Sequence, residues 1–109
     1  MAYDLGLAER LHDLLDERVD VTSKKMFGGL AFMLRGHMFV GVTNDDLMVR
    51  VGAKQHAYAL SLPHARLMDF TGRPMKGYVF VGPGGVESDQ DLAHWVNLGV
   101  EFARTLPPK

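Results

Sequence analysis

The chain has 109 residues, of which 47% are hydrophobic and 23% charged, and its net charge is -1 with His neutral. This length predicts a single domain over residues 1–109, and the composition is typical of a soluble globular protein rather than a disordered, fibrous or membrane protein. The balanced charge disfavours a strongly basic nucleic-acid binder. The chain contains no Cys, which excludes a disulfide scaffold, thiolate-bound zinc, an iron–sulfur cluster and a cysteine nucleophile.

Charge is distributed unevenly along the sequence. Residues 1–22 carry -4, residues 23–77 carry +5 and residues 78–109 carry -2. The basic middle segment has two interpretations: its charges compensate acids on neighbouring elements, or they form a weak surface for a polyanion. The acidic N-terminus lacks the cationic start of a secretory signal, and the longest apolar run, residues 30–34, is far too short to span a bilayer. We therefore expect a cytoplasmic protein without membrane contact.

The first predicted element is a helix that begins at the N-cap Asp4 and continues to about Arg18. Its core-facing residues follow the i, i+4, i+7, i+8 spacing of an amphipathic helix: Leu7, Leu11, Leu14 and Leu15. Closely spaced strand-like runs joined by short polar turns come next, as is typical of an antiparallel meander. These runs predict three or four strands, with candidates over residues 22–27, 30–34, 37–42 and 47–51; the first of them is β-rich only at its start.

The segment that follows predicts a short helix and two strands. Residues 53–60 contain good helix formers and precede Pro63, so they predict a short helix. Gly and Pro then divide the chain into alternating strand and loop. We expect a short strand over residues 66–70, a loop over 71–77, a strand over 78–81 and a turn over 82–85.

The last predicted element is a long amphipathic helix. Ser88 and Asp91 fit a capping box at its start, and Pro107 and Pro108 stop it. Gly99 lies on its apolar stripe and predicts a close approach to a neighbouring backbone. The whole stripe is Leu92, Trp95, Val96, Gly99, Phe102 and Ala103. This order of elements predicts an α+β fold, a two-layer sandwich with a mostly antiparallel sheet and helices on one face.

No catalytic or metal-binding constellation is legible in the sequence. No two His residues have the i, i+4 spacing of a helical zinc site, the five being His12, His37, His56, His64 and His94. No Ser lies in the G-x-S-x-G context of a hydrolase nucleophile, and neither Gly-rich segment has the order of a phosphate-binding P-loop. We therefore expect no metal, no cofactor and no enzymatic activity.

Basic residues are the best candidates for a binding site. Arg73 and Lys76 lie in the predicted loop, and Arg50 lies at the end of a predicted strand. If these cations converge, they form a small patch for a carboxylate or a phosphate. The alternative is that Arg73 and Lys76 pair with Asp69 or with a helix carboxylate. The candidate residues for ligand or partner binding are Arg50, Arg73, Lys76, Lys24 and Lys25.

Three motifs and the C-terminal ending carry a family resemblance. They are KKMFGGLAFM at residues 24–33, DLMVRV at 46–51, DFTGRPMKGY at 69–78 and ARTLPPK at 103–109. In this order, over essentially the whole chain, the sequence resembles the N-terminal domain of the TfoX/Sxy family. The resemblance implies an α+β fold similar to the secretion-chaperone-like arrangement α-β(3)-α-β(2)-α. The chain accommodates that module alone, so we expect a standalone domain without the family's C-terminal domain.

The resemblance also implies a role in bacterial transcription, because the best-known members of the family are positive regulators of competence genes that work alongside the cyclic-AMP receptor protein. The leading hypothesis is a non-enzymatic regulatory module that acts through a protein partner, such as the transcription machinery. The alternative is a protein that binds small anionic ligands through the basic loop. Direct DNA binding ranks lower because no helix-turn-helix is legible. An exposed edge strand could support a homodimer.

Overall fold

The computed structural model describes residues 3–16, 18–26, 28–70 and 73–107, with side chains at all of these positions except 26, 68–70 and 73–75. The described elements are, in chain order, α1 (Leu5–Leu15), β1 (Val21–Met26), β2 (Gly29–Leu34), β3 (His37–Thr43), β4 (Asp46–Arg50), α2 (His56–Ser61), β5 (Ala65–Phe70), β6 (Arg73–Val81), the 3₁₀ turn η1 (Pro83–Gly85) and α3 (Asp89–Ala103). The predicted α+β class is confirmed. Four strands precede the middle helix, where the family resemblance implies three.

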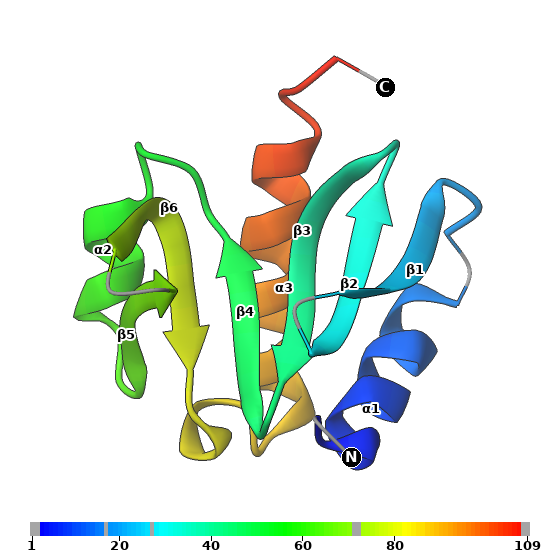
Figure 1. Cartoon of the computed structure of the whole chain (residues 1–109), viewed down its shortest axis with the longest axis horizontal. Helices are drawn as coiled ribbons and strands as arrows, with labels where there is room; N and C mark the ends of the chain where they lie inside the picture. The colour runs from blue at the N-terminus through cyan, green and yellow to red at the C-terminus, as the bar shows by residue number, and fades with distance from the viewer. Residues whose placement is uncertain (1–2, 17, 27, 71–72, 108–109) are drawn as a thin grey trace.

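The six described strands form one antiparallel sheet in the order β1-β2-β3-β4-β6-β5. Strand β6 lies between β4 and β5, so the sheet is not a simple meander (Figure 1). Residues that lie opposite one another in paired strands share a face of the sheet. One such row crosses the whole sheet through Lys24, Ala31, Gly41, Met48, Phe80 and Arg66.

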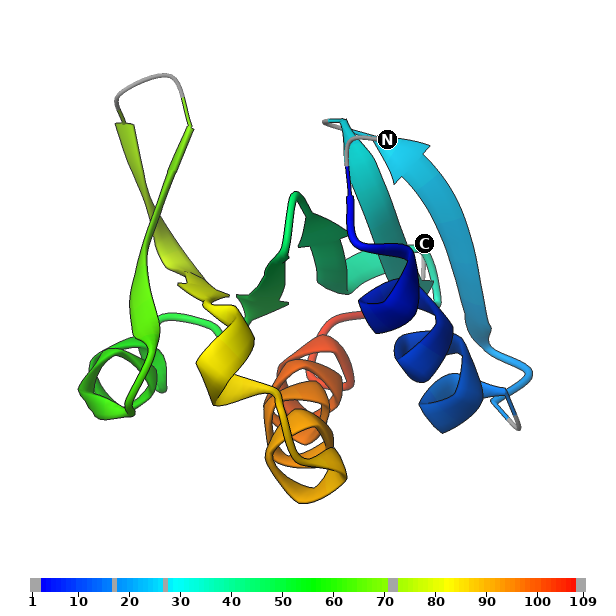
Figure 2. The same ribbon diagram turned by 90° about the horizontal axis from the view of Figure 1, so that it is seen from below.

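Helices cover one face of the sheet. Figure 2 shows α1, α2 and α3 on the same side, with the outer strands curving away from them. The side chains buried between the two layers form one cluster with members from all three helices and the sheet. Its fully buried members include Leu11, Phe32, Phe39, Leu47 and Leu92. On the other face, a small second cluster of Met48 and Phe80 packs with Met38 and Tyr78. The predicted two-layer sandwich is confirmed.

Both long helices begin at their predicted N-caps. The Asp4 carboxylate accepts hydrogen bonds from the N–H groups of Gly6 and Leu7, at 2.8 and 3.2 Å. The Ser88 hydroxyl oxygen accepts one from the N–H of Asp91 at 3.0 Å. These bonds satisfy N–H groups that have no partner within the first turn of a helix. Among the described residues, no helix is both long enough and apolar enough to cross a membrane.

The core-facing side of α1 differs from the predicted stripe at one position. Leu7, Leu11 and Leu15 are buried as predicted, but the prediction for Leu14 was wrong, since this residue is 42% exposed. Successive helical residues are separated by about 100°, so Ala8 and Leu14 lie on opposite sides of Leu11, about 60° from it. Ala8 is the buried one. The helix is therefore turned toward Ala8, which leaves Leu14 at the rim of the interface.

Gly99 brings α3 close to the sheet. A Cβ atom at this position would lie 2.7 Å from the carbonyl oxygen of Phe39 in β3, closer than Cβ atoms approach backbone in proteins. The predicted close approach is confirmed. The other stripe residues are also buried except Phe102, which is half-buried because it faces a groove described below.

The predicted loop over residues 71–77 was wrong for most of its length. Residues 73–77 belong to β6, and β5 and β6 continue to pair as far as Phe70 opposite Arg73. Pro74 is tolerated because β4 pairs with β6 only up to Arg50 opposite Tyr78, so the outer part of β6 has a single partner. The Gly and Pro content of residues 73–77 is therefore that of a strand segment that continues past the end of β4. Residues 71 and 72 lie outside the described structure.

Candidate binding site

Arg50 lies at the end of β4, stacked against two aromatic rings. Its guanidinium carbon is 5.5 Å from the ring centroid of Tyr78 in β6 and 5.1 Å from that of Phe102 in α3. Both distances allow cation–π attraction. The carbonyl oxygen of Tyr78 also accepts a hydrogen bond from Nε2 of His56, at 3.2 Å. The stacking therefore holds the guanidinium at one end of the sheet, between the strands and α3.

Two glycines bring further cations to this end of the sheet. The N–H groups of Val51 and Gly52 donate to the carbonyl of Gly77 at 2.8 and 3.0 Å. Gly52 and Gly77 have φ angles of 83° and 89°, which residues with a Cβ rarely adopt. A Cβ at Gly77 would lie 3.3 Å from Cα of Gly52, so the two backbones are in contact. This contact places the exposed Lys76 beside the segment that carries the exposed Lys54.

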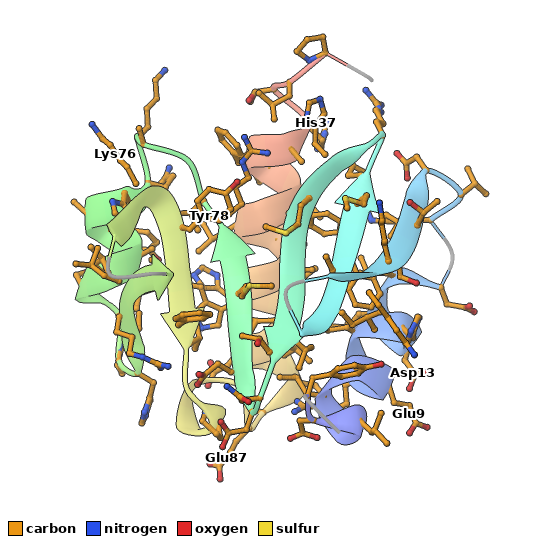
Figure 3. The ribbon with its side chains drawn as sticks, in the orientation of Figure 1. Glu9, Asp13, His37, Lys76, Tyr78 and Glu87 are labelled. Atoms are coloured by element: carbon orange, nitrogen blue, oxygen red, sulfur yellow. The ribbon has the colours of Figure 1, made fainter. Side chains whose placement is uncertain are left out.

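We call Arg50, Lys54 and Lys76 the cation cluster. None of the three forms an ion pair with a carboxylate that the structure describes. Figure 3 shows Lys76 projecting from this end of the molecule, above Tyr78. Uncompensated positive charge at one place favours contact with an anionic group.

Three other arginines are already paired. The ion pairs of the described structure are Arg10 with Asp89 at 3.1 Å, Arg35 with Asp20 at 3.7 Å and Arg66 with Asp46 at 2.6 Å. The hydrogen bond to Asp46 holds the pKa of the Arg66 guanidinium above its ordinary value, with partial burial acting in the opposite direction. The basic middle segment is thus compensated in part, as one of its two interpretations requires, and part of its remaining charge gathers in the cation cluster.

The remaining candidate residues are separated from the cluster or lie outside what is described. Lys24 and Lys25 are exposed on β1, at the opposite edge of the sheet. Three strands lie between β1 and β6, which corresponds to about 19 Å at about 4.8 Å per strand. The backbone of Arg73 lies near the tip of the β5–β6 hairpin, and its side chain is outside the described structure. The structure therefore brings together Arg50 and Lys76 of the predicted set, and ligand binding by any of the five stays a prediction.

A groove of about 680 Å³ lies next to the cation cluster. One wall is the C-terminal half of α3, and the other is the segment 51–55 between β4 and α2; we call it the α3 groove. Its apolar surface comes from Val51, Leu98 and Phe102. Gly52 makes room for the Phe102 ring, since a Cβ there would lie 2.6 Å from Cε1 of that ring. The ring of Phe102 thus lines the groove and also stacks with Arg50 of the cluster.

The two walls of the α3 groove run antiparallel. Gly52 packs against Phe102, and the hydroxyl of Tyr58 lies 3.2 Å from Nε2 of His94, within hydrogen-bonding distance. The residue numbers therefore rise on one wall as they fall on the other. Lining residues on α3 extend from His94 to Phe102, a length of about 12 Å at about 1.5 Å per residue. Thr105 lines the groove just beyond the end of the helix.

Opposite charges lie on facing walls of the groove. Lys54 is on the segment before α2 and Glu101 is on α3, and both are exposed. The structure describes both side chains and records no ion pair between them. The amide side chains of Gln55 and Asn97 also face the groove from the two walls. The groove thus offers an apolar floor, one cation, one anion and two amides.

The described residues contain no group of three or more His, Cys, Asp or Glu side chains placed to hold a metal ion. Tyr58 and His94 are the polar side chains that come closest to one another near the groove's end. Each of them is exposed, and their contact joins α2 to α3.

Comparison with known protein families matches residues 13–103 to the TfoX N-terminal domain. The chain belongs to this family. The match extends from α1 to the end of α3, so it includes the cation cluster and both walls of the α3 groove. No curated protein matches the chain at a significant level. The resemblance found in the motifs is confirmed as membership of the TfoX N-terminal domain family.

Sequence reasoning did not find the α3 groove. Phe102 was assigned to the buried stripe, and Lys54 was placed inside a helix that in fact starts at His56. The available signal in the sequence was Gly52, a glycine directly after a predicted strand. In the structure it has the positive φ of a sharp turn. Recognising that its missing side chain accommodates Phe102 requires the packing of α3 on the sheet, which a linear pattern does not contain.

Proposed function

We propose that this member of the TfoX N-terminal domain family is a non-enzymatic regulatory module that acts in the cytoplasm through a protein partner. The partner is a component of the transcription machinery, in keeping with the competence regulators that the motifs resemble. Family membership over residues 13–103 is the observation that carries the proposal. The cation cluster is the proposed contact surface, because its unpaired charges suit an acidic surface on the partner.

The surface of the domain supports a role in binding. Arg50 is held by stacking on Tyr78 and Phe102, so a partner carboxylate would meet a cation whose position is already fixed. A preorganised group loses less conformational entropy on binding than a free side chain. Lys54 and Lys76 add positive charge at the same end of the sheet. Several positive charges close together increase the rate of association with an acidic partner.

The test is capture with cross-linking from a native lysate of the source cells. The tagged wild-type domain should enrich a transcription component, and Lys54→Glu with Lys76→Glu should reduce that enrichment severalfold because charge reversal repels an acidic partner. Arg18→Glu with Arg35→Glu is the matched control, since it makes the same change of charge at exposed positions that belong neither to the cluster nor to the other candidate residues. Capture that is equal for both double variants would show that the cluster is not the contact, and absence of any transcription component would contradict the proposal itself.

The second candidate function is binding of a small anionic ligand by Arg50, Arg73 and Lys76. The gathering of Arg50 and Lys76 beside a groove of about 680 Å³ favours it, because pockets for small ligands occupy about 300–1,000 Å³. A thermal-shift screen with nucleotides, phosphosugars and acyl carboxylates tests this function. If Arg73→Ala and Lys76→Ala leave every ligand-induced shift in Tm unchanged, the basic residues of the β5–β6 hairpin do not form the site.

A further inference from the structure

We propose that the α3 groove binds an extended peptide segment of a protein partner, with a large apolar residue seated on Leu98 and Phe102. An acidic side chain of the peptide pairs with Lys54, and a basic one pairs with Glu101. This inference rests on the proposed partner-binding function and specifies where and how the partner is recognised. Arg50 and Lys76, the other two members of the cation cluster, then contact the partner outside the peptide segment.

The charges of the groove point to an occupant that carries both signs. Lys54 and Glu101 face one another across the groove, and neither has an ion pair with a described residue. A ligand with a single charge would satisfy one wall and be repelled by the other. A peptide segment with an acidic and a basic residue matches both walls, and such complementarity favours specificity over raw affinity.

The amides point to a peptide backbone. Gln55 and Asn97 face the groove from opposite walls, and each side chain carries two N–H donors and a carbonyl acceptor. An extended backbone presents the matching N–H and C=O groups along both of its edges. The groove is about 12 Å long along α3, the length of about four extended residues at about 3.3 Å each. Donors, acceptors and length therefore agree on one occupant.

The exposure of the lining favours a peptide over a small molecule. Val51 is buried, Leu98 and Phe102 are half-buried, and the other seven of the ten lining residues are exposed. Sites for small molecules typically enclose most of the ligand's surface. A ligand here would keep one side in water, which costs a small molecule much of its contact area. A peptide is less affected because the rest of the partner adds contacts elsewhere on the domain.

The experiment selects peptides on the purified domain, so the partner need not be identified first. A random peptide library displayed on phage is panned against wild-type protein, and enriched peptides are measured by fluorescence polarisation. We expect sequences with one Leu, Ile, Phe or Trp flanked by an acid on one side and a base on the other. Ala53→Trp should weaken their binding about tenfold or more, because the indole occupies the groove from an exposed turn position and removes no core contact.

Exchange of the two wall charges gives the sharpest readout. The double variant Lys54→Glu with Glu101→Lys keeps the net charge but inverts the field across the groove, so panning on it should enrich peptides with the opposite order of acid and base. For the original peptides the exchange should cost about two- to fivefold per charge, the range of exposed ion pairs. Glu9→Lys with Arg18→Glu is the matched control and should leave both affinity and order unchanged (Figure 3 places Glu9 on α1, away from the groove).

Each other result overturns the inference. If no peptide is enriched, if Ala53→Trp leaves affinity unchanged, or if the charge exchange leaves the order of acid and base unchanged, the groove is not a peptide site. Binding of small acyl carboxylates that Ala53→Trp abolishes, without peptide enrichment, would assign the groove to a small ligand instead. These failures are distinct from failure of the proposed function, because that function is tested by capture of a transcription component with the wild-type domain, in which the groove is unchanged.

Discussion

Replacement of Gly99 by Ala tests how closely α3 packs on the sheet, because two effects of opposite sign meet at this residue. In a helix interior, Ala is more favourable than Gly by about 0.8–1.0 kcal/mol. The added Cβ, however, would lie 2.7 Å from the carbonyl oxygen of Phe39 and 3.2 Å from Cγ1 of Val40. The first of these contacts is with the backbone of β3, which has β2 and β4 on either side and cannot yield as a flexible side chain does.

Overpacking of a core typically costs about 1–3 kcal/mol, and contact with backbone in an inner strand puts Gly99→Ala in the upper part of that range. After the gain in helix propensity, we expect a net loss of about 1–2 kcal/mol in the free energy of unfolding. For a domain of this size each kcal/mol lowers Tm by about 4–8 °C. Urea denaturation followed by circular dichroism measures the first quantity and calorimetry the second.

Asn97→Ala is the control for that experiment, since Asn97 is exposed on the same helix. It makes a similar gain in propensity without a new contact, so we expect it to be neutral or stabilising by up to about 0.7 kcal/mol. If Gly99→Ala is as stable as the wild type, the helix can move away from β3 at little cost, which would refute close packing as the reason for a glycine here.

Three further substitutions test other parts of the structure. Gly52→Ala should destabilise the domain by at least about 1–2 kcal/mol, because its φ of 83° is costly for Ala and the added Cβ meets the Phe102 ring. The midpoint of denaturant unfolding measures this loss, and an unchanged midpoint would mean that the turn relaxes. Ser88→Ala should cost about 0.5–2 kcal/mol through loss of the N-cap, read as a lower Tm, with Ser88→Asp close to wild type. Arg66→Ala should cost about 1–2 kcal/mol, because the Asp46 carboxylate that it pairs with at 2.6 Å is only 14% exposed and loses this partner, although Arg66 itself is 53% exposed; a loss below about 0.5 kcal/mol by urea titration would contradict that reasoning.

Elements with a strong local signal were predictable from the sequence. The caps at Asp4 and Ser88 are local, since each acceptor bonds to N–H groups two or three residues away. Strands β2, β3 and β4 are short, largely apolar runs with polar turns between them, and β1 begins with β-favouring residues. The structure has all four candidate strands within two residues of the predicted bounds, which settles the number that the sequence left at three or four. Gly99 was also informative, because a glycine on an otherwise apolar helical stripe leaves space for a neighbouring backbone. For the caps and the strands the determining contacts are local, whereas the glycine indicates only that α3 has a close neighbour and not that this neighbour is β3.

Predictions failed where the outcome depended on contacts distant in sequence. Leu14 fits the apolar spacing as well as Leu7 does, and only the packing of Ala8 on the sheet decides which side of α1 is buried. Residues 73–77 have loop composition, yet they are a strand because β5 provides a partner for them. Glycine and proline are common in loops, but they are also tolerated in a strand that is unpaired along one edge.

The cation cluster follows from the order of the strands rather than from any spacing along the chain. In a meander that continued from β4 to β5, β6 would lie two strands from β4, about 10 Å away. Instead β6 is next to β4, which places Tyr78 opposite Arg50 and lets the carbonyl of Gly77 accept from Gly52. This strand order brings Lys76 to the end of β4. Because Gly52 also accommodates Phe102, the cation cluster lies next to the α3 groove. One topological choice therefore assembles both proposed contact surfaces, so a change that weakens the pairing of β4 with β6 should impair both together.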